Sequence, residues 1–187
     1  LNSFSQTDKN SEDLLLKLIL PYKQATIAYV DSAVPYDTTF LFNKIKKDTL
    51  INSNNNDYLV LTPAEKVFIK SEVLKNNNYC WDDGVFENSL IIHKDSMWNY
   101  LKIQNTLIYD SLLVAYENAD STSIKKYRFK YAWVFLFSKP IFLRNESVCL
   151  LSFAAFVSPN GGHAEMGFYR KNNGKWEGWI GLSSGDW

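Results

Sequence analysis

Histidine and cysteine, the residues most used for metal binding and nucleophilic catalysis, are scarce in this sequence. It has two of each among 187 residues, namely His93, His163, Cys80 and Cys149. Two cysteines are too few for the disulfide framework of a small secreted domain, and they lack zinc-site spacing. One disulfide is open to them in an exported protein, but we expect two unpaired thiols, because Cys149 lies in an apolar strand. We predict no metal or cofactor and assign no catalytic residue.

An excess of charge of one sign is also missing. Lys+Arg and Asp+Glu both number 20, so the formal net charge is zero. Proteins that bind nucleic acid or an anionic membrane usually carry a basic excess or a basic stripe, so no nucleic acid is predicted as a partner. Two short basic clusters are expected to be solvated surface: Lys44/Lys46/Lys47 and Lys125/Lys126/Arg128.

No apolar run approaches the length of about 18 residues that spans a bilayer, so no transmembrane segment is predicted. No signal peptide is present, and the sequence begins with Leu1-Asn2-Ser3 rather than with methionine. Residues 1–13 are rich in Ser, Asn and Asp, and we expect a flexible leader there. Such a leader is typical of the tether of an exported lipoprotein. The alternative is that the sequence begins at an arbitrary position. We expect an exported protein, periplasmic or at the cell surface, with a lipid anchor upstream of residue 1.

The remaining composition is typical of a folded domain. Hydrophobic residues make up 46%, charged residues 21% and aromatic residues 16%, with six Trp. These values exclude intrinsic disorder for the body of the chain. We therefore predict one α+β domain over residues 14–187, with most aromatic side chains in its core.

The first half of the chain predicts short elements. A helix is expected to open at residues 11–13, whose acidic side chains suit the helix dipole, and to end before Pro21. Residues 25–30 and 89–93 read as strands. Residues 95–120 fit a helix loosely, but their β-branched and aromatic content would also fit strands.

The clearest local signal in this half is a capping box. Thr62 suits the N-cap, Pro63 the first helical position and Glu65 the third, and they predict a helix that runs to about Lys75. The helical spacing places Val67, Lys70, Ser71 and Leu74 on one face, with Phe68 and Ile69 beside it.

The last third of the chain predicts an antiparallel sheet. Residues 131–137 and 148–157 are apolar on both alternating faces, which indicates central strands covered on both sides. Residues 164–170 and 175–182 follow and are more amphipathic, and local connections make the four strands a meander. The predicted fold class is α+β, with N-terminal helices packed on a twisted antiparallel sheet formed mainly by residues 129–182.

Two turns separate the last three strands. Asn172-Asn173-Gly174 predicts a tight hairpin, because Asn and Gly accept the positive φ that this turn requires. Pro159-Asn160-Gly161-Gly162 predicts the other connection, which we expect to be longer and more flexible.

Two segments of this region carry short structural motifs, a strand exit and a hairpin: Ser138-Lys139-Pro140-Ile141-Phe142 and Asn173-Gly174-Lys175-Trp176. With the apolar strand and the Gly-containing loop between them, they resemble the C-terminal half of a group of uncharacterised exported bacterial proteins and lipoproteins. The resemblance covers residues 129–182 and not the N-terminal half. It implies a secreted or lipoprotein setting and carries no activity to this chain.

The loop at Gly161 and Gly162 holds the first candidate site. These glycines let the backbone approach a ligand closely, and His163 with Glu165 adds a titratable pair at the rim of a rigid sheet. A His-x-Glu pair occurs in zinc deaminases, but their Pro-Cys-x-x-Cys segment is absent here. A mobile, solvated loop is the plainer alternative.

Aromatic residues near the C-terminus form the second candidate. Trp176 and Trp179 fall on opposite faces of a regular strand, so one is expected in the core and the other at least partly exposed. An exposed Trp beside Tyr169 could stack on a sugar or anchor a partner protein, with core packing as the alternative. The binding residues assigned from the sequence are His163, Glu165, Gly161, Gly162, Tyr169 and Trp179.

Three function classes stay open. The first is an exported, non-enzymatic binding protein, for instance an inhibitor or an immunity-type partner of another protein. The second is a hydrolase-like enzyme that uses His163 and Glu165, and the third is a small-ligand carrier with a pocket between helices and sheet. A deep polar pocket at His163 would favour the enzyme, a deep apolar pocket the carrier, and a filled core with an exposed apolar patch the protein binder.

Overall fold

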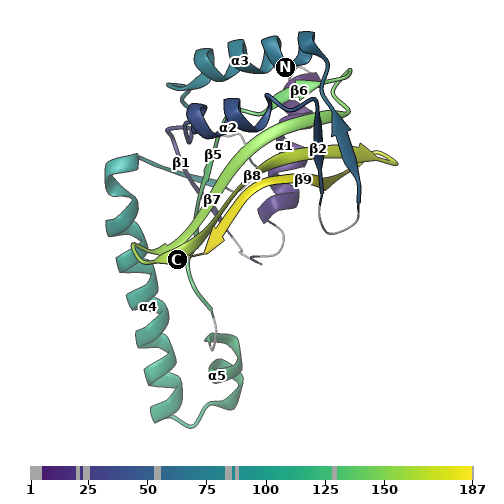
Figure 1. Ribbon diagram of the computed structural model, residues 1–187. Coiled ribbons are helices and arrows are strands. Elements are labelled where there is room, and N and C mark those ends of the chain that lie inside the picture. Colours follow the sequence, from purple (N-terminus) through teal and green to yellow (C-terminus); the bar gives the residue numbers. More distant parts are fainter. Residues whose placement is uncertain are drawn as a thin grey trace.

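The computed structural model describes residues 6–19, 22, 26–52, 56–82, 86, 89–127 and 130–186. Within these ranges, helices accompany a seven-stranded sheet and a two-stranded hairpin (Figure 1). The helices are α1 (Gln6–Ile19), α2 (Thr38–Lys44), α3 (Pro63–Asn76), α4 (Met97–Glu117) and α5 (Ser121–Tyr127), and a 3-10 turn, η2 (Lys94–Ser96), precedes α4. The strands are β1 (Ile27–Val30), β2 (Thr49–Ile51), β3 (Tyr58–Val60), β4 (Ser89–Ile92), β5 (Val134–Phe137), β6 (Ile141–Leu143), β7 (Val148–Ser158), β8 (Gly161–Asn172) and β9 (Lys175–Asp186). The predicted α+β class is confirmed.

The large sheet joins an antiparallel part to a parallel part. Its order is β4-β1-β5-β7-β8-β9, with β6 paired to β7. The part β5-β7-β8-β9 is the antiparallel meander predicted from the last third of the chain. Beyond β5, β1 and β4 continue the sheet in parallel, so the sheet begins within the N-terminal half.

The two turns of the meander are both tight. At the Asn173–Gly174 turn the φ angles are 50° and 75°, which confirms the predicted hairpin. The predicted long, flexible loop at residues 159–162 is wrong. Gly161 and Gly162 already pair with β7 as the first residues of β8, because a β-bulge near Val157 lets Pro159 and Asn160 close the chain alone.

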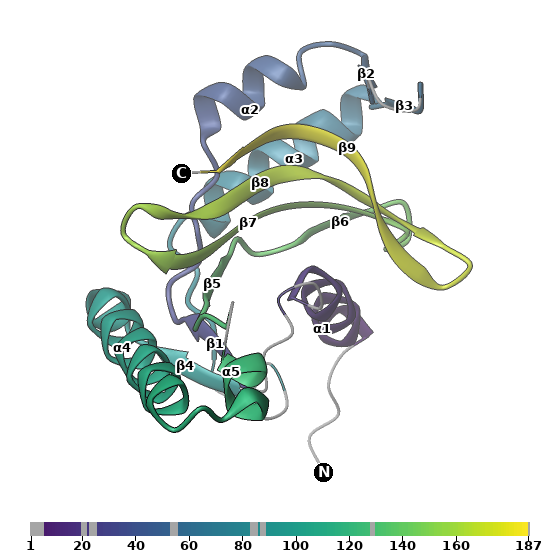
Figure 2. The ribbon, with the colours of Figure 1, turned by 90° about the horizontal axis from the view of Figure 1, so that it is seen from below.

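Side chains of the long strands alternate between two covered faces. We name the α1 face after its helix; it carries Phe135, Phe137, Cys149 and Phe153. We name the opposite side the α3 face; α2, α3 and the β2–β3 hairpin cover its one end, and α4 packs on β1 and β5 at the other. Figure 2 shows α1 on one side of strands β7–β9 and α2 and α3 on the other. This two-sided cover explains why β5 and β7 are apolar on both faces.

Helix α1 begins earlier than expected. It starts at Gln6 rather than at residues 11–13, so residues 6–13 of the expected flexible leader are helical. It ends at Ile19, before Pro21 as predicted, and its buried Leu14 and Leu15 pack on the α1 face. Residues 1–5 of the leader lie outside the described part of the chain.

Helix α3 confirms the predicted capping box. Thr62 Oγ1 accepts the Glu65 amide and the Glu65 carboxylate accepts the Thr62 amide. On the face that the spacing defines, Val67 is 69% and Leu74 is 62% exposed. The buried residues are Ile69, which the spacing placed beside that face, and Val73. Because apolar residues lie on several sides of this helix, their spacing in the sequence does not identify the face that packs on the sheet.

Residues 97–117, left open between helix and strands, form the long helix α4. Its first turns pack on the sheet through Met97 and Leu101. Its later turns extend beyond the sheet together with α5 (Figure 1). None of the described helices is both long and apolar enough to cross a lipid bilayer.

Both cysteines are free thiols, as expected. Cys80 is exposed, whereas Cys149 is fully buried on the α1 face. Burial raises the pKa of the Cys149 thiol well above its ordinary value, so this residue is an inert part of the core.

Candidate functional site

The structure places three of the predicted site residues on one face of a strand. His163, Glu165 and Tyr169 lie in β8 with even spacing, so their side chains project toward the α1 face. His163 Nδ1 is 2.6 Å from a carboxylate oxygen of Asp186 at the end of β9, and its Nε2 is 3.5 Å from Glu165 Oε2. Tyr169 donates its hydroxyl to the other Glu165 oxygen. We call Asp186, His163, Glu165 and Tyr169 the polar chain.

The charges of the polar chain favour the protonated form of His163 by raising its pKa. Burial alone would lower its pKa, but the hydrogen bonds and negative charges of Asp186 and Glu165 outweigh this and raise it above 6.5. Burial first, and then Glu165, also raises the pKa of Tyr169. Tyr22 lies near the same carboxylates, and burial followed by their charges raises its pKa as well.

This geometry is poorly suited to acid–base catalysis. A general base needs a free ring nitrogen within reach of the proton it removes. Both ring nitrogens of His163 face carboxylates, and its raised pKa favours the form in which both nitrogens are donors. The polar chain therefore acts as a clasp that holds the last residues of β9 against β8.

The clasp predicts a pH-dependent stability difference between wild type and His163→Gln. A pKa raised in the folded state contributes stability that is complete below pH 6.5 and is lost as the pH rises through the folded-state value. At pH 5 we expect the free energy of unfolding of the variant to be about 0.5–1 kcal/mol lower than that of wild type, which is the range of a surface ion pair. At alkaline pH we expect this difference to vanish. Urea unfolding at several pH values measures it.

The control for this experiment is the other histidine. The ring of His93 is 69% exposed and lies 3.8 Å from the nearest carboxylate, that of Asp31. His93→Gln should give a difference from wild type that is small at every pH. A difference for His163→Gln that grows toward alkaline pH would contradict the clasp.

Three predicted residues also border a hollow of about 220 Å³ in the middle of β8 and β9. Glu165, Tyr169 and Trp179 are among its lining residues, together with Asn52 and the serines of β9. His163, Gly161 and Gly162 are not among them. The predicted site is thus divided: His163 belongs only to the clasp and Trp179 only to the hollow, whereas Glu165 and Tyr169 belong to both.

Tyr169 and Trp179 do not form one stacking surface. Tyr169 is 5% exposed and packs with the buried Trp176 on the α1 face. Trp179 lies on the α3 face, half-buried, with the Arg170 guanidinium 5.3 Å from its ring centroid. One Trp of the pair, Trp176, is in the core and the other, Trp179, is partly exposed, as predicted. For Tyr169, the alternative of core packing is the arrangement found.

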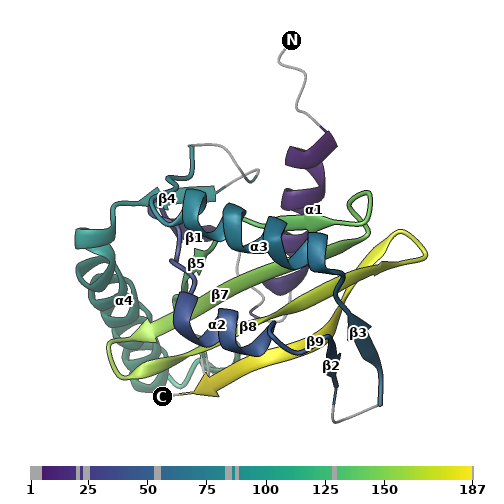
Figure 3. The same ribbon diagram turned by 45° about the horizontal axis from the view of Figure 1, so that its top comes forward.

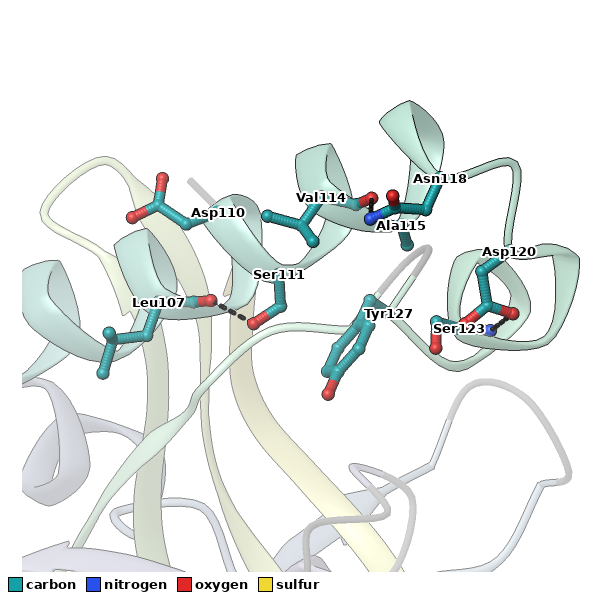
Figure 4. Close-up of a pocket in the computed structure, with 9 residues that line it drawn as sticks. All are labelled: Leu107, Asp110, Ser111, Val114, Ala115, Asn118, Asp120, Ser123 and Tyr127. Atoms are coloured by element: carbon teal, nitrogen blue, oxygen red, sulfur yellow. Dashed lines mark hydrogen bonds between the residues drawn. The ribbon is translucent and has the colours of Figure 1, made fainter.

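A second candidate site, not predicted from the sequence, lies on α4 and α5. A groove of about 430 Å³ runs between these helices (Figure 4). Most polar groups in it are satisfied within the helices: Ser111 donates to the Leu107 carbonyl at 2.7 Å and Asn118 to the Val114 carbonyl at 2.9 Å. Its lining residues are Leu107, Asp110, Ser111, Val114, Ala115, Asn118, Asp120, Ser123 and Tyr127.

The outer turns of α4 beside this groove are unusually apolar for an exposed helix. We call residues 103–117 with α5 the arm. Six large apolar side chains of its long helix are between 41% and 60% exposed: Ile103, Leu107, Tyr109, Leu113, Val114 and Tyr116. The sequence does carry a signal for this surface, since only Lys102 and Asp110 are charged between Met97 and Tyr116. A solvated helix face is normally far more polar.

No group of His, Cys, Asp or Glu side chains in the described ranges is arranged to hold a metal ion. In comparisons with known proteins, no family model, curated protein or solved structure matches the chain.

Proposed function

We propose that this chain is a non-enzymatic binding protein whose ligand is another protein, and that the arm is its binding surface. The observation that carries the proposal is the row of half-exposed apolar side chains along α4. Contiguous apolar patches on soluble monomers are usually sites of interaction with proteins or membranes. Aromatic anchors such as Tyr109 and Tyr116 are enriched among the residues that dominate protein interfaces.

The spacing of these residues suits a helical or flat partner surface. Leu107 and Val114 are two helical turns apart and lie on one side of α4, next to the groove. Tyr109, Leu113 and Tyr116 follow the i, i+4, i+7 pattern and form a second stripe. Two adjacent stripes on a projecting helix offer a broad apolar surface that is open to a partner of protein size.

The other two function classes have less support. The hydrolase hypothesis needs a free histidine nitrogen, and both nitrogens of His163 face carboxylates. The carrier hypothesis needs a pocket between helix and sheet, whereas Leu14 and Leu15 fill the space under α1 with no exposed surface. A filled core with an exposed apolar patch is the arrangement expected of a protein binder.

Retention of partner proteins from the native host tests this proposal. The tagged chain is compared with the double variant Leu107→Ser/Val114→Ser, and retained proteins are identified by mass spectrometry. We expect one or more proteins to be retained by wild type and at least tenfold less by the variant. Truncated interface anchors cost about 2 kcal/mol or more, and about 1.4 kcal/mol is already tenfold.

The chain supplies a matched control on another helix. Val67→Ser/Leu74→Ser changes the same residue types at positions of α3 that are 69% and 62% exposed. This variant should retain the partner as wild type does. Equal loss in both variants, or no retained protein with wild type, would contradict an arm-mediated partner.

The finer expectation is an inhibitor or immunity-type role, and with it an exported setting. Once a partner is known, its own activity with and without the chain tests inhibition directly. Fractionation of native cells tests the setting that the sequence resemblance implies.

A further inference from the structure

Besides the arm, the outer edge of β9 is a second candidate binding surface. β9 is the last strand of the sheet, so the backbone groups that point away from β8 have no neighbouring strand among the described residues. Side chains cover the first half of this edge. Lys17 donates to the Trp176 carbonyl, and Asn52 donates to the Trp179 carbonyl at 2.7 Å.

The second half of the edge, residues 180–185, is open. In the described chain, no backbone hydrogen bond reaches it from any element other than β8. An unpaired edge is a template for pairing with another extended chain. This edge has one irregularity, the β-bulge at Leu182, so a pairing chain meets regular backbone on either side of that residue.

A groove of about 200 Å³ lies beside this open half, between β9 and β2. Its apolar wall is formed by Leu50 and Ile51 of β2 and by Ile180 and Leu182 of β9. Lys44 and Lys47 also line it, together with Thr49 and Gly181, and no acidic residue does. The nearest carboxylate in sequence, that of Asp48, is already paired with Lys66 at 2.7 Å.

We propose that this edge binds an extended acidic peptide segment of a partner protein by strand addition. The peptide backbone pairs with residues 180–185, one apolar side chain enters the groove, and a carboxylate meets Lys44 and Lys47. Strand addition takes affinity from main-chain hydrogen bonds and specificity from side-chain pockets. The two lysines without an acidic neighbour in the groove select a carboxylate over a neutral or basic segment.

This peptide site is separate from the arm. In Figures 1, 2 and 3 the β2–β3 hairpin lies at the end of the molecule away from α4. The peptide-site proposal can therefore be tested independently of the proposed arm interface.

Selection from phage-displayed random heptapeptides against the intact chain tests the proposal. We expect the enriched peptides to contain β-branched or aromatic residues and at least one Asp or Glu. The most enriched peptide, synthesised with a fluorescent label, should bind at least tenfold more weakly to Lys44→Glu/Lys47→Glu. The control Lys94→Glu/Lys102→Glu makes the same charge change at two exposed lysines outside both the arm and the groove, and it should bind within twofold of wild type.

Amide hydrogen exchange locates the contact. On addition of the peptide, protection should increase within residues 180–185. Three results would overturn the proposal: enrichment without acidic residues, equal binding to the charge-reversed variant, or protection elsewhere in the chain. Protection of residues 180–185 without peptide, together with a dimeric mass in solution, would instead assign the edge to a second copy of this chain and also overturn it.

Discussion

Replacing Phe135 with alanine is expected to lower the free energy of unfolding by about 3–5 kcal/mol. Phe135 has no exposed surface and lies in β5, where the parallel and antiparallel parts of the sheet meet. Its ring is 5.1 Å from that of Tyr22 and 6.2 Å from that of Phe137. Removal leaves a cavity bounded by strands on both sides, which cannot move inward to fill it.

Urea unfolding followed by tryptophan fluorescence measures this loss. Phe68→Ala on α3 is the control, because Phe68 is 45% exposed, and we expect a change within about 0.5 kcal/mol. Phe135→Leu should lie between the two and keeps the comparison possible if the alanine variant does not fold. A loss below about 1 kcal/mol for Phe135→Ala would mean that the α1 face is not packed as described.

The antiparallel part of the sheet could be predicted because its strands are long and carry their own signals. β7 is apolar on both faces over eleven residues, and Asn173–Gly174 sets the hairpin between β8 and β9. β6 is three residues long and was read as part of a strand exit. The parallel partners β1 and β4 were expected as strands, but pairing across such a sequence distance leaves no local pattern to read.

The candidate site shows the same division between local and distant information. The predicted strand 164–170 placed Glu165 and Tyr169 on one strand, but His163 was predicted in the loop before it, whereas β8 begins at Gly161 and includes all three residues. Asp186 was not predicted, because its position depends on two β-bulges. The pairing that begins at Asn172 and Lys175 would place Ser184 opposite His163 if the strands were regular. Register shifts near Met166 and Phe168 move the partner by two residues, to Asp186.

The arm was missed for a different reason. Residues 97–117 are apolar on so many sides that neither the helical nor the strand period stands out. The sequence does not show where the sheet ends, so the apolar residues of α4 that face the sheet could not be told from those of its outer turns, which extend beyond the sheet (Figure 1). The sequence signal for the arm is therefore its number of apolar residues, which is larger than one buried helix face can hold.

Replacing Gly162 with alanine is the second change with a large expected effect, about 1–3 kcal/mol of lost stability. Neither Gly161 nor Gly162 has a positive φ angle, so the cost does not come from backbone strain. A Cβ at Gly162 would lie 2.7 Å from the backbone oxygen of Ala155 across the ladder, which only a shift of β7 or β8 can relieve. At Gly161 the nearest atom is the Ser158 hydroxyl at 2.9 Å, a side-chain end that can rotate away. Gly161→Ala is therefore the matched control, and we expect it to lower the free energy of unfolding by less than about 1 kcal/mol in the same urea titration. Equal losses at the two positions would show that the β7–β8 hairpin is looser than its pairing register implies.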